Sequence, residues 1–200
     1  MKYPKNINDV GTLLPDYMGF IFYQNSKRFV GDDFPSKSFK KLPKSIKKVG
    51  VFVNQSLERM LEIHNKYSFD TFQLHGNESV ETCANLKEKG VEIIKVFMVD
   101  NDFDFEQTKP YESVCDFYLF DTKTDNYGGS GVAFNWEILE NYTQTKPFFL
   151  SGGLGLHNYN QIKKIEHSLL IGLDFNSRLE DDKHKKIIEE VSEIINSIRN

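Results

Sequence analysis

The chain has 200 residues, and a composition of 39% hydrophobic and 27% charged residues is that of an ordinary globular protein. A formal net charge of -4 provides no basic surface for nucleic acid, and the apolar runs are too short for a membrane-spanning helix or a signal peptide. Two cysteines, Cys83 and Cys115, without C-x-x-C spacing indicate buried, reduced thiols in a cytoplasmic protein, not a disulfide framework or a zinc site.

Short apolar runs and amphipathic segments alternate along the chain, and a helix-like segment at residues 6–14 comes first. The runs are almost continuously apolar, which is typical of parallel strands covered on both faces. They lie at residues 17–23, 48–54, 71–76, 92–99, 117–122, 148–153 and 169–175. The amphipathic segments carry apolar residues at helical spacing and lie at residues 55–66, 79–89 and 182–198. His64 lies on such an apolar stripe, which indicates a packed side chain and not a metal ligand.

This alternation of strand and helix predicts an α/β fold, either an open doubly wound sheet or a closed barrel. No G-x-G-x-x-G follows an early strand, which disfavours a dinucleotide-binding sheet. We therefore expect a (β/α)8 TIM barrel. Because no linker or change of composition interrupts the alternation, residues 1–200 are expected to form a single domain.

A closed barrel of this type has eight strands, each followed by a helix, whereas this sequence predicts seven strands after a leading helix. The first strand is therefore expected to be missing from the written sequence. Either an internal methionine has been assigned as the start, or the barrel has a gap. We favour the first explanation, because a gap exposes two unpaired strand edges and the remaining site residues fit their roles.

The active site of such a barrel forms at the carboxyl ends of the strands. The last two predicted strands are followed by Gly152, Gly153, Asn176 and Ser177. Glycine lets a backbone approach a phosphate closely, and backbone N–H groups then satisfy the phosphate oxygens. These residues are therefore candidates for a phosphate site. The alternative is that Gly152 and Gly153 only form a tight turn.

Asp121 ends the otherwise apolar run FYLFDT and precedes a glycine-rich loop at residues 127–131. A carboxyl group at this position is partly desolvated, which suits a general acid. A helix-capping or ion-paired aspartate is the alternative. Asp174 has the equivalent place on the last predicted strand, where Asn176 and Ser177 already account for the loop.

Five blocks cover nearly the whole chain: PDYMGFIFYQNSKRFVG (15–31), FQLHG (72–76), LFDTKTDNYGGSGVAFNW (119–136), FLSGGL (149–154) and GLDFNSRLE (172–180). In this order and with this strand spacing, they resemble the phosphoribosylanthranilate isomerase family. The resemblance implies an isomerase of L-tryptophan biosynthesis that needs no cofactor or metal. Its reaction would be the Amadori rearrangement of N-(5-phosphoribosyl)anthranilate to 1-(2-carboxyphenylamino)-1-deoxyribulose 5-phosphate.

The same resemblance implies a role for each matching residue. Asp121 would be the general acid, and Arg28 would pair with the anthranilate carboxylate, for which a planar guanidinium is suited. The only partner would be the small-molecule substrate, with no nucleic acid and no membrane, in a monomer or homodimer. The other substrate-binding residues would be Gln73, His75 and Asp174 in the pocket and Gly152, Gly153, Asn176 and Ser177 at the phosphate.

The sequence departs from the family at the general base, a cysteine in a K-x-C-G pattern on the first strand. The family's P-x-N-I segment is present as Pro4-Lys5-Asn6-Ile7, but no cysteine precedes it. Cys83 and Cys115 are expected within a helix and ahead of a strand, remote from the site. An inactive or ligand-binding barrel that keeps the phosphate site is therefore the alternative.

Two other barrel enzymes fit the sequence less well. A histidine-pathway isomerase would use an aspartate on the first strand as its base, and the QLHG and GGSG-x-x-F-x-W blocks argue against it. An indole-3-glycerol-phosphate synthase would need catalytic lysine and glutamate at strand ends. Lys95 could be that lysine, but the rest of the pattern is poor.

Overall fold

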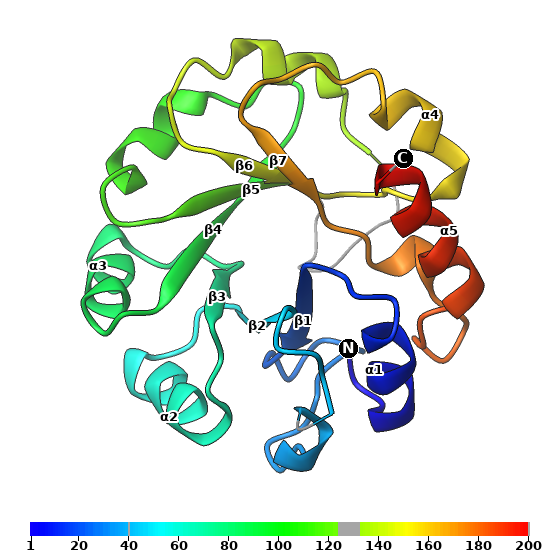
Figure 1. Cartoon of the computed structure of the whole chain (residues 1–200). Coiled ribbons are helices and arrows are strands. Elements are labelled where there is room, and N and C mark those ends of the chain that lie inside the picture. The colour runs from blue at the N-terminus through cyan, green and yellow to red at the C-terminus, as the bar shows by residue number, and fades with distance from the viewer. Residues whose placement is uncertain (40, 124–132, 200) are drawn as a thin grey trace. The chain divides into compact units, whose positions relative to one another are not determined.

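The structure is a computed structural model that describes residues 1–39, 41–123 and 133–199 (Figure 1). It comprises two compact units, Met1–Asn77 with Leu179–Asn200, and Glu78–Arg178. That residues 1–200 form a single domain stays a prediction. The glycine-rich loop at residues 127–131 lies outside the described residues. Among the helices of the described chain, none is both long enough and apolar enough to cross a membrane.

The first unit contains a parallel sheet in the order β1-β2-β3. Gly19 pairs with Val49, and Val51 pairs with Gln73. Helices α1 and α5, from opposite ends of the chain, lie side by side (Figure 1). The elements of this unit are α1 (Pro4–Gly11), β1 (Tyr17–Ile21), η1 (Ser36–Phe39), β2 (Lys47–Phe52), α2 (Leu57–Tyr67), β3 (Thr71–Leu74) and α5 (Ile188–Arg199).

The second unit contains a parallel sheet in the order β4-β5-β6-β7, and helix α3 contacts β4. Most connections between these strands are short 3-10 helices. The elements are α3 (Val80–Glu88), β4 (Glu92–Val99), η2 (Phe105–Tyr111), β5 (Phe117–Thr122), η3 (Trp136–Asn141), β6 (Phe148–Leu150), η4 (Leu156–Asn158), α4 (Tyr159–Ile162) and β7 (Leu170–Leu173). A further 3-10 helix, η5 (Ser177–Leu179), lies at the boundary between the two units.

Local sequence signals account for where the helices begin. Pro4 occupies the first turn of α1, where its missing N–H has no cost. The side chain of Ser56 accepts a hydrogen bond from the backbone N–H of Arg59 at the start of α2, and Ser79 caps α3 in the same way. Helix α2 ends at Tyr67, because the next residue, Ser68, has a left-handed φ of 51° and cannot continue the helix.

The sequence predicts the strands well and one helix start poorly. All seven predicted strands are confirmed, with ends that differ by no more than three residues. The helix predicted over residues 182–198 begins only at Ile188. The carboxylate of Asp181 accepts hydrogen bonds from the backbone N–H groups of Lys183 and Lys185, and His184 has a left-handed φ of 61°. This local turn replaces the expected first turns of the helix.

A buried ion pair lies under helix α3 in the second unit. The Nζ atom of Lys95 lies 3.1 Å from a carboxylate oxygen of Glu78, and both side chains are at most 3% exposed. Lys95 stands opposite Tyr118 in the sheet, and Met98 stands opposite Asp121. Because neighbouring residues of a strand point to opposite faces, Lys95 and Asp121 lie on opposite faces of the sheet. The lysine is therefore remote from the strand-end chemistry that an indole-3-glycerol-phosphate synthase would require.

Removing one charge of this buried pair is expected to destabilise the protein strongly. Glu78→Gln removes the counter-charge of a buried ammonium group and should lower the free energy of unfolding by about 3–5 kcal/mol. The double variant Glu78→Gln/Lys95→Met should be less destabilised than Glu78→Gln alone. Urea denaturation measures both. The control Glu106→Gln breaks the exposed pair with Lys109 and should cost less than about 1 kcal/mol. Equal effects for Glu78→Gln and the control would contradict this account.

Candidate active site

Two predicted phosphate loops come together at one edge of the second unit. Strand β6 pairs with β7 up to Leu150 and Leu173, and the backbone N–H of Asp174 donates to the carbonyl of Leu150 at 2.8 Å. The loops that follow these strands touch, because a Cβ placed on Gly155 would lie 2.8 Å from the Cβ of Arg178. The structure therefore brings the Gly152-Gly153 and Asn176-Ser177 segments to neighbouring strand ends, as expected.

Gly152 is required by its surroundings as well as by its backbone conformation. Its φ is 92°, in the left-handed region that favours glycine. A Cβ on Gly152 would collide with Oγ1 of Thr122 and lie 2.7 Å from the backbone nitrogen of Thr122 and 3.0 Å from Oδ1 of Asp121. The loop after β6 therefore lies directly against the end of β5. A side chain at position 152 would therefore displace Thr122, and phosphate binding by this turn stays a prediction.

Asn158 holds the loop after β6 in shape. Its side-chain Oδ1 accepts from the backbone N–H of Gly155 at 2.9 Å, and its Nδ2 donates to the carbonyl of Gly153 at 3.0 Å. These two bonds satisfy backbone groups inside a buried turn. Sequence patterns do not single out Asn158, because His157, Asn160 and Gln161 are polar neighbours in the same segment.

Asp121 lies at the carboxyl end of β5, beside this loop. The residue as a whole is 8% exposed, and Oδ1 of its carboxylate accepts a hydrogen bond from the backbone N–H of Thr122 at 2.8 Å. The hydroxyl of Thr122 accepts from the backbone N–H of Phe134 at 3.2 Å. A buried carboxylate next to a glycine-lined loop can exchange a proton with a ligand that occupies the loop.

The two cysteines lie away from this edge. Cys83 is within α3 and Cys115 precedes β5, and both are fully buried and free, so the predicted buried thiols are confirmed. The thiols hydrogen-bond to each other. That bond and burial together raise the pKa of the Cys115 thiol above its ordinary value. Neither thiol lies at a strand end from which it could act on a ligand beside Asp121.

In the first unit, Gln73 and His75 lie on the same side of the chain at the end of β3. Nε2 of Gln73 is 3.2 Å from Nδ1 of His75, and the backbone N–H of His75 donates to the carbonyl of Phe52 at 2.8 Å. Gln73 is buried and His75 is partly exposed. The close pair confirms that the two residues face the same way, and their role toward a ligand stays a prediction.

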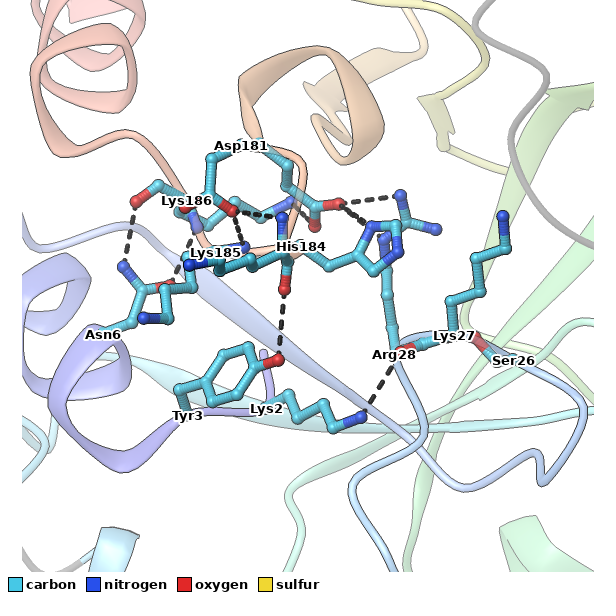
Figure 2. Close-up of polar contacts among 12 residues, drawn as sticks. Lys2, Tyr3, Asn6, Ser26, Lys27, Arg28, Asp181, His184, Lys185 and Lys186 are labelled. Atoms are coloured by element: carbon cyan, nitrogen blue, oxygen red, sulfur yellow. Dashed lines mark hydrogen bonds and ion pairs between the residues drawn. The ribbon is translucent and has the colours of Figure 1, made fainter.

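Arg28 belongs to a cluster of charges around one buried carboxylate, that of Glu180. Nε and Nη2 of Arg28 each lie 2.7 Å from Oε2 of Glu180, whose side chain is 4% exposed. Nζ of Lys186 lies 2.7 Å from Oε1 of the same carboxylate. Figure 2 shows Arg28 on one loop and His184 and Lys186 on another, with the side chains converging. Burial alone would raise the pKa of Glu180, but Arg28 and Lys186 outweigh it and hold that pKa below its ordinary value.

The sequence predicts a role for Arg28 but none for Glu180 or Lys186. Glu180 is the last residue of the block GLDFNSRLE, and Lys186 falls inside the predicted helix, which in the structure begins two residues later. No side-chain spacing along the chain indicates a pair of residues 152 positions apart. Among the residues that the structure describes, no cluster of three His, Cys, Asp or Glu side chains could hold a metal ion.

Known proteins resemble this chain along its whole length. The family profile described as N-(5'phosphoribosyl)anthranilate (PRA) isomerase matches residues 4–197. The N-(5'-phosphoribosyl)anthranilate isomerase of Parabacteroides distasonis is 42% identical over 200 residues, which are 99% of this chain and 90% of that protein.

Solved structures of the same kind of isomerase are also similar to this chain. The phosphoribosyl anthranilate isomerase of Thermotoga maritima superimposes with a TM-score of 0.88 at 30% identity, covering 100% of this chain and 95% of that one. A phosphoribosyl anthranilate isomerase in complex with reduced 1-(o-carboxyphenylamino)-1-deoxyribulose 5-phosphate matches with a TM-score of 0.85 at 26% identity, with the same coverage.

A substitution at Gly152 tests whether close backbone approach builds the loop. Gly152→Ala should lower the melting temperature by several degrees, because the new methyl group collides with Thr122 and the left-handed φ strains an alanine. Gly90→Ala is the matched control, since Gly90 also has a positive φ but nothing within 4 Å of a Cβ. Thermal unfolding followed by circular dichroism compares the two. If both variants lose the same amount of melting temperature, the contact with Thr122 does not shape the loop.

Proposed function

The chain belongs to the N-(5'-phosphoribosyl)anthranilate isomerase family, and on that premise we propose which of its residues carry the reaction. The protein is an isomerase of L-tryptophan biosynthesis. It converts N-(5-phosphoribosyl)anthranilate to 1-(2-carboxyphenylamino)-1-deoxyribulose 5-phosphate by an Amadori rearrangement. Its fold class is α/β, that of the barrel isomerases to which it is similar. The family match over residues 4–197 carries this conclusion, and none of the similar proteins favours the inactive alternative.

We propose that Asp121 is the general acid of the rearrangement. Protonation of the furanose ring oxygen opens the ring to a Schiff base, and loss of the C2 proton gives an enolamine that tautomerises to the ketone. The buried position of the Asp121 carboxylate at the end of β5 supports the first of these steps, because such a group can deliver a proton without competition from water. We assign no residue to the removal of the C2 proton.

The substrate phosphate is proposed to bind at the loops after β6 and β7. The support is the contact between these loops at Gly155 and Arg178, and the closeness of Gly152 to Asp121. Backbone N–H groups of glycine-lined turns can approach phosphate oxygens directly. The proposed ligands are Gly152, Gly153, Asn176 and Ser177.

The anthranilate carboxylate is proposed to bind Arg28. A guanidinium presents paired N–H donors that match the two oxygens of a carboxylate. Gln73, His75 and Asp174 are proposed to line the pocket, each at or just after the end of a strand. The roles of these three residues are to contact the substrate, and none is proposed to exchange a proton with it.

The setting of the enzyme is also a proposal. We propose that the enzyme binds a small phosphorylated substrate and neither nucleic acid nor a membrane. We propose that it acts as a monomer or a homodimer. We place it in the cytoplasm, which the two free thiols support, because reduced cysteines are typical of that compartment.

Substituting Asp121 separates catalysis from binding. Asp121→Asn keeps the size of the side chain and the acceptor for the Thr122 N–H, but an amide cannot deliver the proton. Turnover, followed by the loss of substrate fluorescence, should fall at least about 100-fold. The dissociation constant of the reduced product analogue should change by less than about threefold, because ground-state contacts remain.

The matched control is Asp9→Asn, which changes an exposed aspartate of α1 and should leave both measurements unchanged. Turnover by Asp121→Asn at the rate of the parent chain would remove Asp121 from the acid step. A parallel loss of analogue binding would instead assign it a binding role.

A further inference from the structure

One buried carboxylate organises the basic groups around Arg28. The carboxylate of Glu180 accepts hydrogen bonds from Arg28 on Oε2 and from Nζ of Lys186 on Oε1, each at 2.7 Å. Nδ1 of His184 lies 3.6 Å from Oε2. Arg28 and Lys186 are themselves largely buried, with 15% and 11% of their side chains exposed. Charges held this far from water adopt defined positions, since moving apart would leave each one desolvated and uncompensated.

The geometry of the pair determines which donors of Arg28 can meet a ligand. A guanidinium has five N–H donors in one plane. The side edge, formed by Nε and one N–H of Nη2, is directed at Oε2 of Glu180. The end edge, formed by Nη1 and the other N–H of Nη2, points away from that oxygen by the planarity of the group. This end edge is the one suited to a second carboxylate.

The charges around Arg28 leave a net positive group. Arg28 and Lys186 contribute two formal positive charges and Glu180 one negative charge, so the three together carry +1. With Glu180 alone, the positive charge of Arg28 would be cancelled by a carboxylate already in place. Lys186 restores the attraction for a further anion.

Hydrogen bonds hold the backbone of both segments that carry the cluster, at Arg28 and at Lys186. The backbone N–H of Arg28 donates to Oγ of Ser26 at 3.1 Å. The side chain of Asn6 makes two hydrogen bonds of 2.9 Å to the backbone of Lys186, one to its N–H and one to its carbonyl. Glu180 and Lys186 face each other across an antiparallel bridge. The positions of the three charges are therefore set before any ligand arrives.

We propose that Glu180 and Lys186 are positioning residues for Arg28. Glu180 orients the guanidinium so that its end edge meets the carboxylate of the substrate, and Lys186 keeps the group positively charged. This inference rests on the proposed role of Arg28 as the carboxylate ligand. Glu180 and Lys186 would then make the site selective for substrates that carry a carboxylate on the aromatic ring.

The test compares two ligands on the full chain by titration calorimetry. One is reduced 1-(o-carboxyphenylamino)-1-deoxyribulose 5-phosphate, and the other is the same molecule without the carboxyl group. The parent chain should prefer the carboxylated ligand on the order of 10- to 100-fold, as for a hydrogen-bonded charge pair. Arg28→Met should abolish this preference, so that the two ligands bind with about the same affinity.

Glu180→Gln distinguishes positioning from simple charge. If Glu180 acted only through its charge, its removal would strengthen binding of the carboxylated ligand. The proposal expects the opposite, a preference at least about fivefold lower than in the parent chain, with the affinity for the descarboxy ligand unchanged within about twofold. An unchanged or increased preference, or an equal loss for both ligands, would overturn the positioning role.

Lys186→Met is the second variant, in case Glu180→Gln does not fold. It should also lower the preference for the carboxylated ligand, because Glu180 then cancels the charge of Arg28. An unchanged preference would overturn the proposed role of Lys186. The control Glu62→Gln breaks another arginine–glutamate pair, Arg59–Glu62 at 3.1 Å, and should leave the preference as it is. If Arg28→Met keeps the full preference, the proposed role of Arg28 itself is wrong. If only Arg28→Met lowers it, the positioning inference alone fails.

Discussion

A parallel strand covered on both faces has no place for a polar side chain that lacks a partner. Two buried charged residues on neighbouring strands of the second unit meet that constraint in different ways. Lys95, in the middle of β4, is paired with Glu78 under a helix. Asp121 stands at the very end of β5, where the loop after β6 meets it. The same constraint therefore separates a structural ion pair from a carboxylate that can reach a ligand.

The loops that carry the proposed site obey a related rule, because their buried backbone groups also need partners. Two asparagines supply them. Asn158 closes the turn between Gly153 and Gly155, and Asn6 pairs with both backbone groups of Lys186. Each asparagine bonds to the backbone of a loop. In this account the order of the binding loops comes from these amides, and the chemistry comes from the residues that they hold.

Much of this arrangement could be predicted from the sequence, because the fold depends on local patterns. Apolar runs marked every strand, and Gly152 marked a turn whose φ only glycine adopts easily. The start of α5 could not be predicted from apolar periodicity, since Asp181 organises a competing turn. Glu180 and Asn158 were missed for another reason. Their importance lies in contacts made by folding, and the 152 positions between Arg28 and Glu180 leave no trace in sequence spacing.

The most direct test of the proposed site is a crystal structure of this chain with the reduced product analogue. We expect the phosphate on the backbone N–H groups of Gly152 and Gly153 and beside Asn176 and Ser177. We expect the ring carboxylate on Arg28, with Glu180 still bound to the other edge of the guanidinium. A phosphate bound elsewhere, or a carboxylate that does not touch Arg28, would contradict the account.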